Sequence, residues 1–301
     1  MPRIPASAAY RSPLPDSIAL NDLDMPAAVS APVGIFDSGL GGLSVLRHIH
    51  EQLPREALLY FADSAFAPYG GKPEAAVVDR TLAIADFLAA QGVKALVIAC
   101  NTATATAITA VRQRYPSLPV VGVEPGLKPA ALRSVSRIVG VLATERTLGS
   151  ARFQALEAQL AEASRVRFLA QACSGLADQV EKGELRSAAT ASLVRRYVEP
   201  LIAQGADTLV LGCTHYPFLL PLIAATAKSA GAPEVAIIDT GTAVARQLER
   251  VLTERSLLRG PDGFAGSVSG WTTGSASALA AACLRLLKMK VPVTSLSENA
   301  D

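Results

Sequence analysis

The stretch Leu96–Thr104, LVIACNTAT, decides the fold of this chain. It begins as an apolar run typical of a buried strand, reaches Cys100, and continues in polar residues that favour the start of a helix. The same design returns at Leu209–Pro217, LVLGCTHYP, where a second apolar run ends at Cys213. We therefore predict two buried strands that present their cysteines to one shared substrate.

Apolar strands alternate with helical segments on both sides of these two stretches. The sequence predicts strands at Val33–Phe36, Leu58–Ala62, Ala95–Ala99, Val120–Val123, Arg137–Ala143, Val166–Gln171, Thr208–Leu211 and Val235–Ile238. In each half the first strand precedes the cysteine strand by a similar interval, which indicates a weak internal duplication. Alternation of this kind predicts parallel sheets whose carboxyl ends lie along one edge, where ligands of open α/β sheets bind.

Six acidic or thiol side chains come just after the predicted strands: Asp37, Asp63, Cys100, Glu124, Cys213 and Asp239. Parallel strands would gather these groups at the carboxyl edge of each sheet. The sequence therefore predicts an α/β protein of two similar domains, with central mostly parallel sheets and an active site in the cleft between them.

Composition limits the class of protein. The 301 residues are 50% hydrophobic and 18% charged, which is enough apolar material for a sizeable core. A formal charge of +2 argues against a nucleic-acid or anionic-membrane partner. No apolar run reaches the roughly 18–20 residues of a membrane span, and the four cysteines fit no disulfide framework. We expect a cytoplasmic protein.

Two thiols facing one carbon suggest a particular reaction. One thiolate removes a proton from one face of a stereocentre, and the other thiol delivers a proton to the opposite face, so the product is the mirror image. We expect helix N-termini to favour the thiolates of Cys100 and Cys213. A redox pair lacks the usual CxxC spacing here. A single-thiol hydrolase or lyase leaves one cysteine unexplained, and a binding-only protein leaves both unexplained.

Other groups have less specific roles from their pattern alone. The glycine-rich turn 39–42 fits a phosphate or a small carboxylate ligand, and the loop around Tyr69 fits either a lid or a plain surface loop. His215 is a natural proton partner for Cys213. Cys173 and Cys283 are expected to be structural, and no Cys/His cluster predicts a metal site.

The motifs together resemble those of the cofactor-independent glutamate racemases of the aspartate/glutamate racemase superfamily. They stand in the family's order: GIFDSGLGGLSVLR (34–47), YFADSAFAPYGGK (60–72), VIACNTATA (97–105), GVEPGLKPA (122–130), GVLAT (140–144), LGCTHYPFL (211–219) and IDTGTAVA (238–245). The resemblance implies interconversion of L- and D-glutamate without a cofactor or metal, to supply D-glutamate for peptidoglycan. It also implies a homodimer. A sister racemase for aspartate or a hydantoin is the nearest alternative.

The resemblance also implies roles for individual residues. Cys100 and Cys213 correspond to the two acid/base thiols, assisted by Asp37 and His215 respectively. The family's further glutamate follows a Cys-Pro motif, but Cys173 is followed here by Ser174. We take Glu181 as the candidate. The implied substrate contacts are Asp37, Ser38, Tyr69, Gly70, Asn101, Thr102, Thr214 and His215.

The family fold leaves its first domain, builds the second and returns. The resemblance therefore implies a first domain of residues 33–123 plus 239–290 and a second domain of residues 124–238. Residues 1–32, rich in Pro, Ser and Ala, are expected to form a mobile extension, and residues 291–301 a frayed tail.

Overall fold

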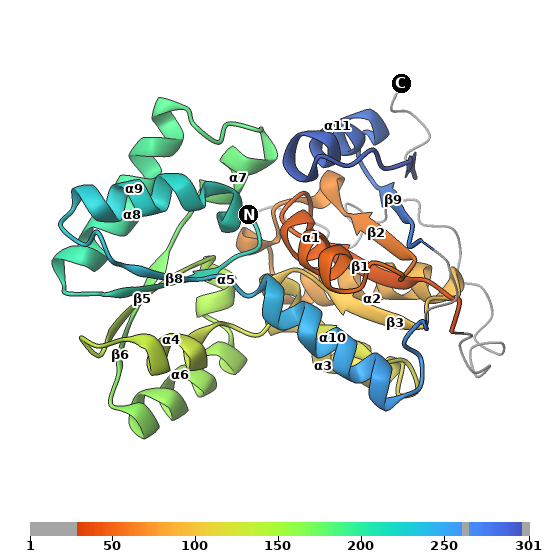
Figure 1. Ribbon diagram of the computed structural model, residues 1–301, viewed down its shortest axis with the longest axis horizontal. Coiled ribbons are helices and arrows are strands. Elements are labelled where there is room, and N and C mark those ends of the chain that lie inside the picture. Colours follow the sequence, from red (N-terminus) through yellow and green to blue (C-terminus); the bar gives the residue numbers. More distant parts are fainter. Residues whose placement is uncertain (1–28, 261–264, 297–301) are drawn as a thin grey trace, which may run out of the picture.

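The computed structural model describes residues 29–260 and 265–296. It contains two parallel sheets that lie in separate halves of the molecule, each covered by helices (Figure 1). The expected α/β fold is confirmed. Most of the predicted extension, residues 1–28, lies outside the described residues.

Sheet A occupies the half on the right of Figure 1, with strand order β10-β9-β2-β1-β3-β4. Its central strands are buried along their whole length because helices cover both faces. The strands are β1 (Val33–Asp37), β2 (Leu58–Ala62), β3 (Ala95–Ile98), β4 (Val120–Gly122), β9 (Val268–Thr272) and β10 (Val293–Ser295).

Two groups of helices cover sheet A. The first group packs in one core cluster with residues such as Leu46 and Leu248, and comprises α1 (Leu43–Gln52), α10 (Gly241–Glu254) and α11 (Ala276–Leu287). The second group packs in a separate cluster, and comprises α2 (Glu74–Ala90) and α3 (Asn101–Arg114). Two 3₁₀ turns, η2 (Ser64–Phe66) and η3 (Tyr69–Gly71), connect β2 to α2.

Sheet B occupies the other half, with strand order β6-β5-β7-β8. Its strands are β5 (Ile138–Ala143), β6 (Arg167–Ala172), β7 (Thr208–Gly212) and β8 (Ala236–Ile238). One face packs on α4 (Leu127–Arg133) and α6 (Ala151–Ser164). The other packs on α7 (Leu176–Glu181), α8 (Ala188–Ala203) and α9 (Leu220–Ser229). The short elements α5 (Glu145–Leu148) and η4 (Tyr216–Leu219) follow β5 and β7.

The two sheets share one strand order. The order β2-β1-β3-β4 within sheet A repeats as β6-β5-β7-β8 in sheet B, so β3 and β7 are equivalent interior strands. These are the strands that precede Cys100 and Cys213. Each cysteine therefore lies at the carboxyl end of the third strand of its four-strand unit, where a parallel sheet presents ligand-binding groups.

The chain crosses between the sheets twice, after β4 and after β8, and the two crossovers touch. A Cβ atom on Gly126 would lie only 2.8 Å from Cγ2 of Ile238 and 3.3 Å from Cγ2 of Thr240. Glycine is therefore required where the crossovers pass each other. The domain bounds 33–123 with 239–290, and 124–238, stay a prediction.

The expectation of a frayed tail over 291–301 is wrong for residues 291–296. Val293–Ser295 forms β10, which pairs in parallel with β9, and Val291 is 6% exposed. A three-residue edge strand is too short to produce a readable period, so only tertiary pairing reveals it. Residues 297–301 lie outside the described residues.

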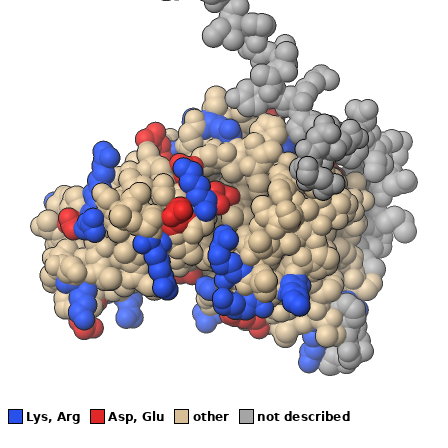
Figure 2. All heavy atoms as spheres, turned by 90° about the horizontal axis from the view of Figure 1, so that it is seen from above, with Lys and Arg blue, Asp and Glu red and all other residues tan. Residues whose placement is uncertain are grey.

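The face of the molecule in Figure 2 carries Lys and Arg side chains interspersed with Asp and Glu over both halves. That face has no continuous basic stripe of the kind that tracks a nucleic-acid backbone. Within 29–260 and 265–296, no helix combines the length and apolar character needed to cross a membrane.

Candidate active site

Cys100 lies at the carboxyl end of β3, where the chain turns into α3. Its backbone is extended, and its Sγ caps the helix by accepting a hydrogen bond from the Ala103 N–H at 3.4 Å. The Ser38 Oγ lies 3.7 Å from the same sulfur. Cys100 as a residue is 5% exposed, so helix capping and burial together fix the position of its thiol.

Burial dominates the protonation of Cys100. It raises the pKa of the thiol to about 12, and the nearby Asp37 carboxylate adds to the increase. The Ala103 N–H and Ser38 act in the opposite direction but more weakly. The expectation that the helix N-terminus would favour the thiolate is therefore wrong for Cys100 in this state, because desolvation outweighs the helix dipole.

Cys213 follows β7 and heads a line of three interacting side chains. Its Sγ lies 3.5 Å from Nδ1 of His215, and Nε2 of His215 lies 2.6 Å from Oε1 of Glu181. The expected helix N-terminus is wrong here, because the 3₁₀ turn η4 intervenes before α9 begins at Leu220. His215, rather than a helix dipole, is the group that contacts this thiol.

The charges of His215 and Glu181 support each other. Burial lowers the pKa of His215, but Cys213 and Glu181 outweigh burial and hold it well above its ordinary value. Burial raises the pKa of Glu181, but its hydrogen bond and charge interaction with His215 bring it below its ordinary value. Both pKa shifts favour the charged forms, an imidazolium and a carboxylate, beside Cys213.

Asp37 connects the two halves of the molecule from the end of β1. It is 0% exposed, accepts a hydrogen bond from the Gly39 N–H at 2.8 Å, and accepts another from the Thr214 hydroxyl at 3.2 Å. Burial raises the pKa of this carboxyl, while His215 opposes the increase. The carboxylate therefore interacts with groups that accompany both cysteines, and the two thiols are themselves close enough to interact electrostatically.

The glycine-rich turn 39–42 has no room for a phosphate. A Cβ atom on Gly39 would overlap the Glu181 carboxylate, and one on Gly41 would overlap the His215 ring. A Cβ on Gly42 would approach Cβ of Asp37 at 2.5 Å. The turn therefore receives side chains from the sheet B half, which excludes the phosphate-cradle interpretation.

Asn101, the first residue of α3, is a buried polar residue without a partner. The residue is 4% exposed, and neither Nδ2 nor Oδ1 of its side chain makes a hydrogen bond within the described part of the chain. It borders a cavity of about 10 Å³ that Thr104 and Thr147 also line, which is about the space of one water molecule. An unpaired buried amide is costly, so the arrangement suits a ligand that supplies the missing partners.

Two threonines from the sheet B half approach Thr102, and the sequence reasoning missed both. The Thr102 hydroxyl lies 3.0 Å from that of Thr144 and 3.4 Å from that of Thr147. Thr144 follows β5, the strand equivalent to β1, so its position corresponds to that of Asp37 in the other sheet. This equivalence was the signal available in the sequence.

The loop around Tyr69 is fixed to the protein rather than free. The Tyr69 hydroxyl donates to Asp63 at 2.6 Å, and Arg80 binds the same carboxylate through two hydrogen bonds of 2.7 Å. A Cβ on Gly70 would lie 2.9 Å from Cβ of Thr144. The Tyr69 hydroxyl is therefore already engaged by Asp63, and Gly70 lies against the sheet B half.

The other two cysteines are also buried, and Cys173 shares a core cluster with Cys213. Burial raises the pKa of Cys283, on α11, to about 11, and it raises the pKa of Cys173 further. Both side chains are therefore neutral thiols in core clusters. Among residues 29–260 and 265–296, no three His, Cys, Asp or Glu side chains are arranged to hold a metal ion.

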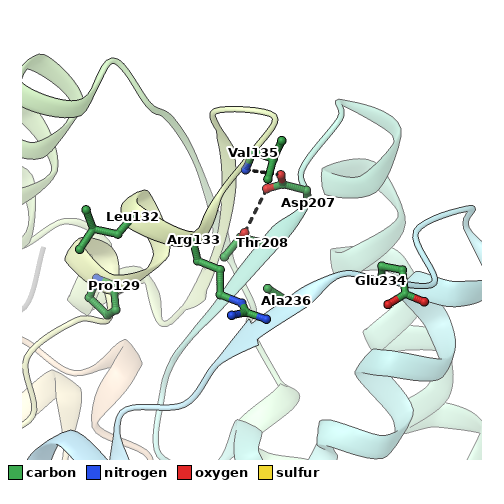
Figure 3. A pocket seen from close by; sticks show the side chains of 8 residues that line it. All are labelled: Pro129, Leu132, Arg133, Val135, Asp207, Thr208, Glu234 and Ala236. Atoms are coloured by element: carbon green, nitrogen blue, oxygen red, sulfur yellow. Dashed lines mark hydrogen bonds between the residues drawn. The ribbon is translucent and has the colours of Figure 1, made fainter.

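A separate concavity of about 810 Å³ lies at the amino ends of β7 and β8, the edge of sheet B opposite to the cysteines (Figure 3). Arg133 points across it, and Asp207 is occupied by hydrogen bonds from the Val135 N–H and the Ser134 hydroxyl. Its lining contains no thiol or histidine. The chemistry therefore favours the buried region around Cys100 and Cys213 as the candidate site.

Comparisons with known proteins bear on this geometry. The family model described as Asp/Glu/Hydantoin racemase matches residues 33–248. A glutamate racemase of Ectopseudomonas mendocina is 55% identical over 228 residues, which are 76% of this chain and 84% of that protein.

Solved structures agree with the sequence comparison. The glutamate racemase isoform RacE1 of Bacillus anthracis has a TM-score of 0.78 at 32% identity, with 90% of this chain and 99% of that chain covered. The Escherichia coli glutamate racemase, solved with L-glutamate and the activator UDP-MurNAc-ala, has a TM-score of 0.75 at 29% identity, with 89% and 98% covered.

Proposed function

We propose that this chain, which belongs to the Asp/Glu/hydantoin racemase family, interconverts L- and D-glutamate by proton transfer between two cysteines. It is a racemase, an enzyme of the isomerase class. The observation that carries the two-cysteine mechanism is the equivalent placement of Cys100 and Cys213 at the ends of β3 and β7. The L-glutamate bound by the Escherichia coli relative supports the substrate.

In the proposed reaction, the thiolate of one cysteine removes the α-proton of glutamate from one face. The electron pair of the Cα–H bond stays on the substrate as a carbanion. The thiol of the other cysteine then donates its proton to the opposite face, and the carbanion becomes the mirror-image amino acid. The first cysteine ends protonated and the second ends as a thiolate, so atoms and charge balance.

The two cysteines have different support in this proposal. Asp37 and Ser38 assist Cys100 and take part in substrate binding, while His215 and Glu181 assist Cys213. The imidazolium of His215 stabilises the Cys213 thiolate through their 3.5 Å contact. The remaining contacts proposed for glutamate are Tyr69, Gly70, Asn101, Thr102 and Thr214, with His215. Thr144 joins them through its contact with Thr102.

The setting proposed for the reaction follows from the same family. The product D-glutamate supplies peptidoglycan biosynthesis, and through it cell-wall formation and cell shape. We propose a cytoplasmic enzyme that works as a homodimer without a cofactor or metal, and without nucleic-acid or membrane partners.

The mechanism is tested by Cys100→Ser and Cys213→Ser, each measured in both directions by circular dichroism. Both variants should lose nearly all racemisation, because a serine hydroxyl is a far weaker acid than a thiol. Cys283→Ala is the matched control, because that thiol lies in the core of α11. Turnover in heavy water should place deuterium on the product α-carbon. Near-wild-type turnover of both enantiomers by either serine variant would refute the two-base mechanism.

The substrate is tested by offering L-glutamate, L-aspartate and a simple hydantoin without any added cofactor. Loss of optical activity with glutamate alone is the expected result. Preferential turnover of aspartate or the hydantoin would assign the chain to a sister racemase of the same family. Net hydrolysis or elimination in place of racemisation would support a hydrolase or lyase with a single working thiol.

A further inference from the structure

The groups that support the two cysteines have different origins. Cys100 receives its hydrogen-bonding contacts from the Ala103 N–H and from Ser38, both in the sheet A half with the cysteine itself. The His215–Glu181 pair that supports Cys213 belongs to the sheet B half, but the N–H of Leu40 donates to Glu181 from the sheet A half. The pair of side chains that supports Cys213, His215 and Glu181, is therefore held by one hydrogen bond that spans the two halves.

This hydrogen bond is accepted by the same carboxylate oxygen that contacts His215. Oε1 of Glu181 accepts from the Leu40 N–H at 2.7 Å and lies 2.6 Å from Nε2 of His215. One carboxylate oxygen thus connects the sheet A backbone to the imidazole that contacts the Cys213 sulfur. A charge-assisted hydrogen bond of this length both orients the carboxylate and stabilises its negative charge.

The turn that carries Leu40 is shaped to receive this carboxylate. Gly39 and Gly41 lie against Glu181 and His215, where any Cβ atom would overlap them. The Gly39 carbonyl accepts a hydrogen bond from the buried Tyr60 hydroxyl at 2.7 Å, which holds the peptide plane and so directs the Leu40 N–H. The Leu40 N–H can reach Glu181 only while the two halves are in contact.

We propose that the backbone N–H of Leu40 is a positioning group that couples contact between the two halves to proton transfer at Cys213, while proton transfer at Cys100 is independent of it. The inference rests on the proposed racemase function. In the closed form, the N–H orients Glu181, Glu181 orients His215, and His215 stabilises the Cys213 thiolate. When the halves separate, the Leu40 N–H leaves Glu181 on the Cys213 side, whereas the loss on the Cys100 side is a different hydrogen bond, from the Thr214 hydroxyl to Asp37.

The most direct test replaces the Leu40 amide with an ester by incorporating the α-hydroxy analogue of leucine at position 40. This change removes the N–H donor and keeps the side chain. We expect kcat/KM to fall about tenfold, the value of one hydrogen bond to a charged group. The fall must be equal in both directions, because the equilibrium constant between enantiomers is one. The rate alone therefore cannot identify the affected cysteine.

Isotope effects on kcat/KM with glutamate deuterated at the α-carbon identify that cysteine. If only the Cys213 step is slowed, the effect rises for the enantiomer that Cys213 deprotonates, because breaking the Cα–H bond becomes more rate-limiting. For the other enantiomer the slow step becomes protonation by the Cys213 thiol, so the effect falls. A loss of folded protein would change neither value.

Two controls separate the N–H from other consequences of the ester. An ester also weakens the Gly39 carbonyl as an acceptor, and Tyr60→Phe removes the hydrogen bond to that carbonyl alone. Because the Leu40 N–H remains in Tyr60→Phe and loses only its orienting contact, that variant should give smaller opposite isotope shifts than the ester. Gly39→Ala, which pushes Glu181 away sterically, should reproduce them, whereas Gly260→Ala adds a methyl group where nothing lies within 4 Å.

The outcomes discriminate clearly. Opposite shifts in the ester and Gly39→Ala proteins support the proposal. Isotope effects that stay at the wild-type values, or that move together for both enantiomers, overturn it even if the rate falls. A wild-type protein that does not racemise glutamate would overturn the proposed function itself, before any variant is compared.

Discussion

Replacing Asn101 with leucine should make the protein more stable and less active at the same time. Leucine has nearly the shape of asparagine but no polar atoms. Nδ2 and Oδ1 of Asn101 are both buried and unpaired in the described structure. Because a buried polar group without a partner costs about 1–3 kcal/mol, Asn101→Leu should raise the free energy of unfolding of the unliganded protein by about that amount.

Substrate binding should change in the opposite direction. We propose that glutamate supplies the partners missing from Asn101, so Asn101→Leu should weaken binding by about 10- to 100-fold, the range of one or two hydrogen bonds to charged groups. Saturating glutamate stabilises the wild-type protein according to its free concentration relative to Kd. The variant should show little of this stabilisation at the same concentration.

Urea unfolding and thermal unfolding, each with and without glutamate, measure both effects. Thr81→Val is the matched control, because Thr81 also has a buried, unpaired hydroxyl but lies on α2 outside the candidate site. It should leave activity and glutamate stabilisation unchanged. If Asn101→Leu instead lowers the stability of the unliganded protein while glutamate still stabilises it fully, Asn101 is a structural residue and the reasoning fails.

Two further predictions concern buried charges. Lys94→Met removes the 2.5 Å ion pair and leaves the Glu56 carboxylate buried without it, so the free energy of unfolding should fall by about 3–5 kcal/mol. The double variant Lys94→Met/Glu56→Gln should recover most of that loss in urea unfolding, and strictly additive losses would contradict the coupling. The raised pKa of His215 stabilises the fold fully at pH values below the ordinary histidine pKa of 6.5. The lowered pKa of Glu181 stabilises it at pH values above the ordinary glutamate pKa of 4.5. Glu181→Gln should therefore destabilise the protein most between pH 4.5 and pH 6.5. The loss should shrink as pH rises through the folded-state pKa of His215, and a loss that grows instead would show that the pair is not ionised.

The placement of the cysteines was readable in the sequence because its causes are local. An apolar run that ends in a capping residue predicts a strand followed by a turn into a helix, and parallel strands bring such ends to one edge. Cys100 meets this pattern fully, since its own sulfur caps α3. Cys213 meets it less well, because η4 separates it from α9.

The protonation of the site was not readable, because it depends on tertiary burial. The pattern around Cys100 predicts a lowered pKa from the helix N-terminus, yet desolvation raises it. The role of Glu181 was likewise not readable from the sequence. Its local sequence does not distinguish it from the exposed Glu184, and only the packing of α7 against η4 brings its carboxylate to His215. Contacts across the two halves are invisible to a local pattern.

The raised pKa of Cys100 is compatible with a role as a base when the acidity of the substrate is considered. The α-proton of an amino acid is held far more strongly than a thiol proton, so a thiolate from a thiol of higher pKa is the stronger base. Burial therefore lowers the population of the thiolate but increases its strength. The ammonium group of a bound amino acid would bring a positive charge next to Asp37 and Cys100, and a positive charge lowers the pKa of a nearby thiol. In this account the substrate completes the site: the thiolate becomes populated only when the proton it must remove is present, which limits side reactions of a free thiolate.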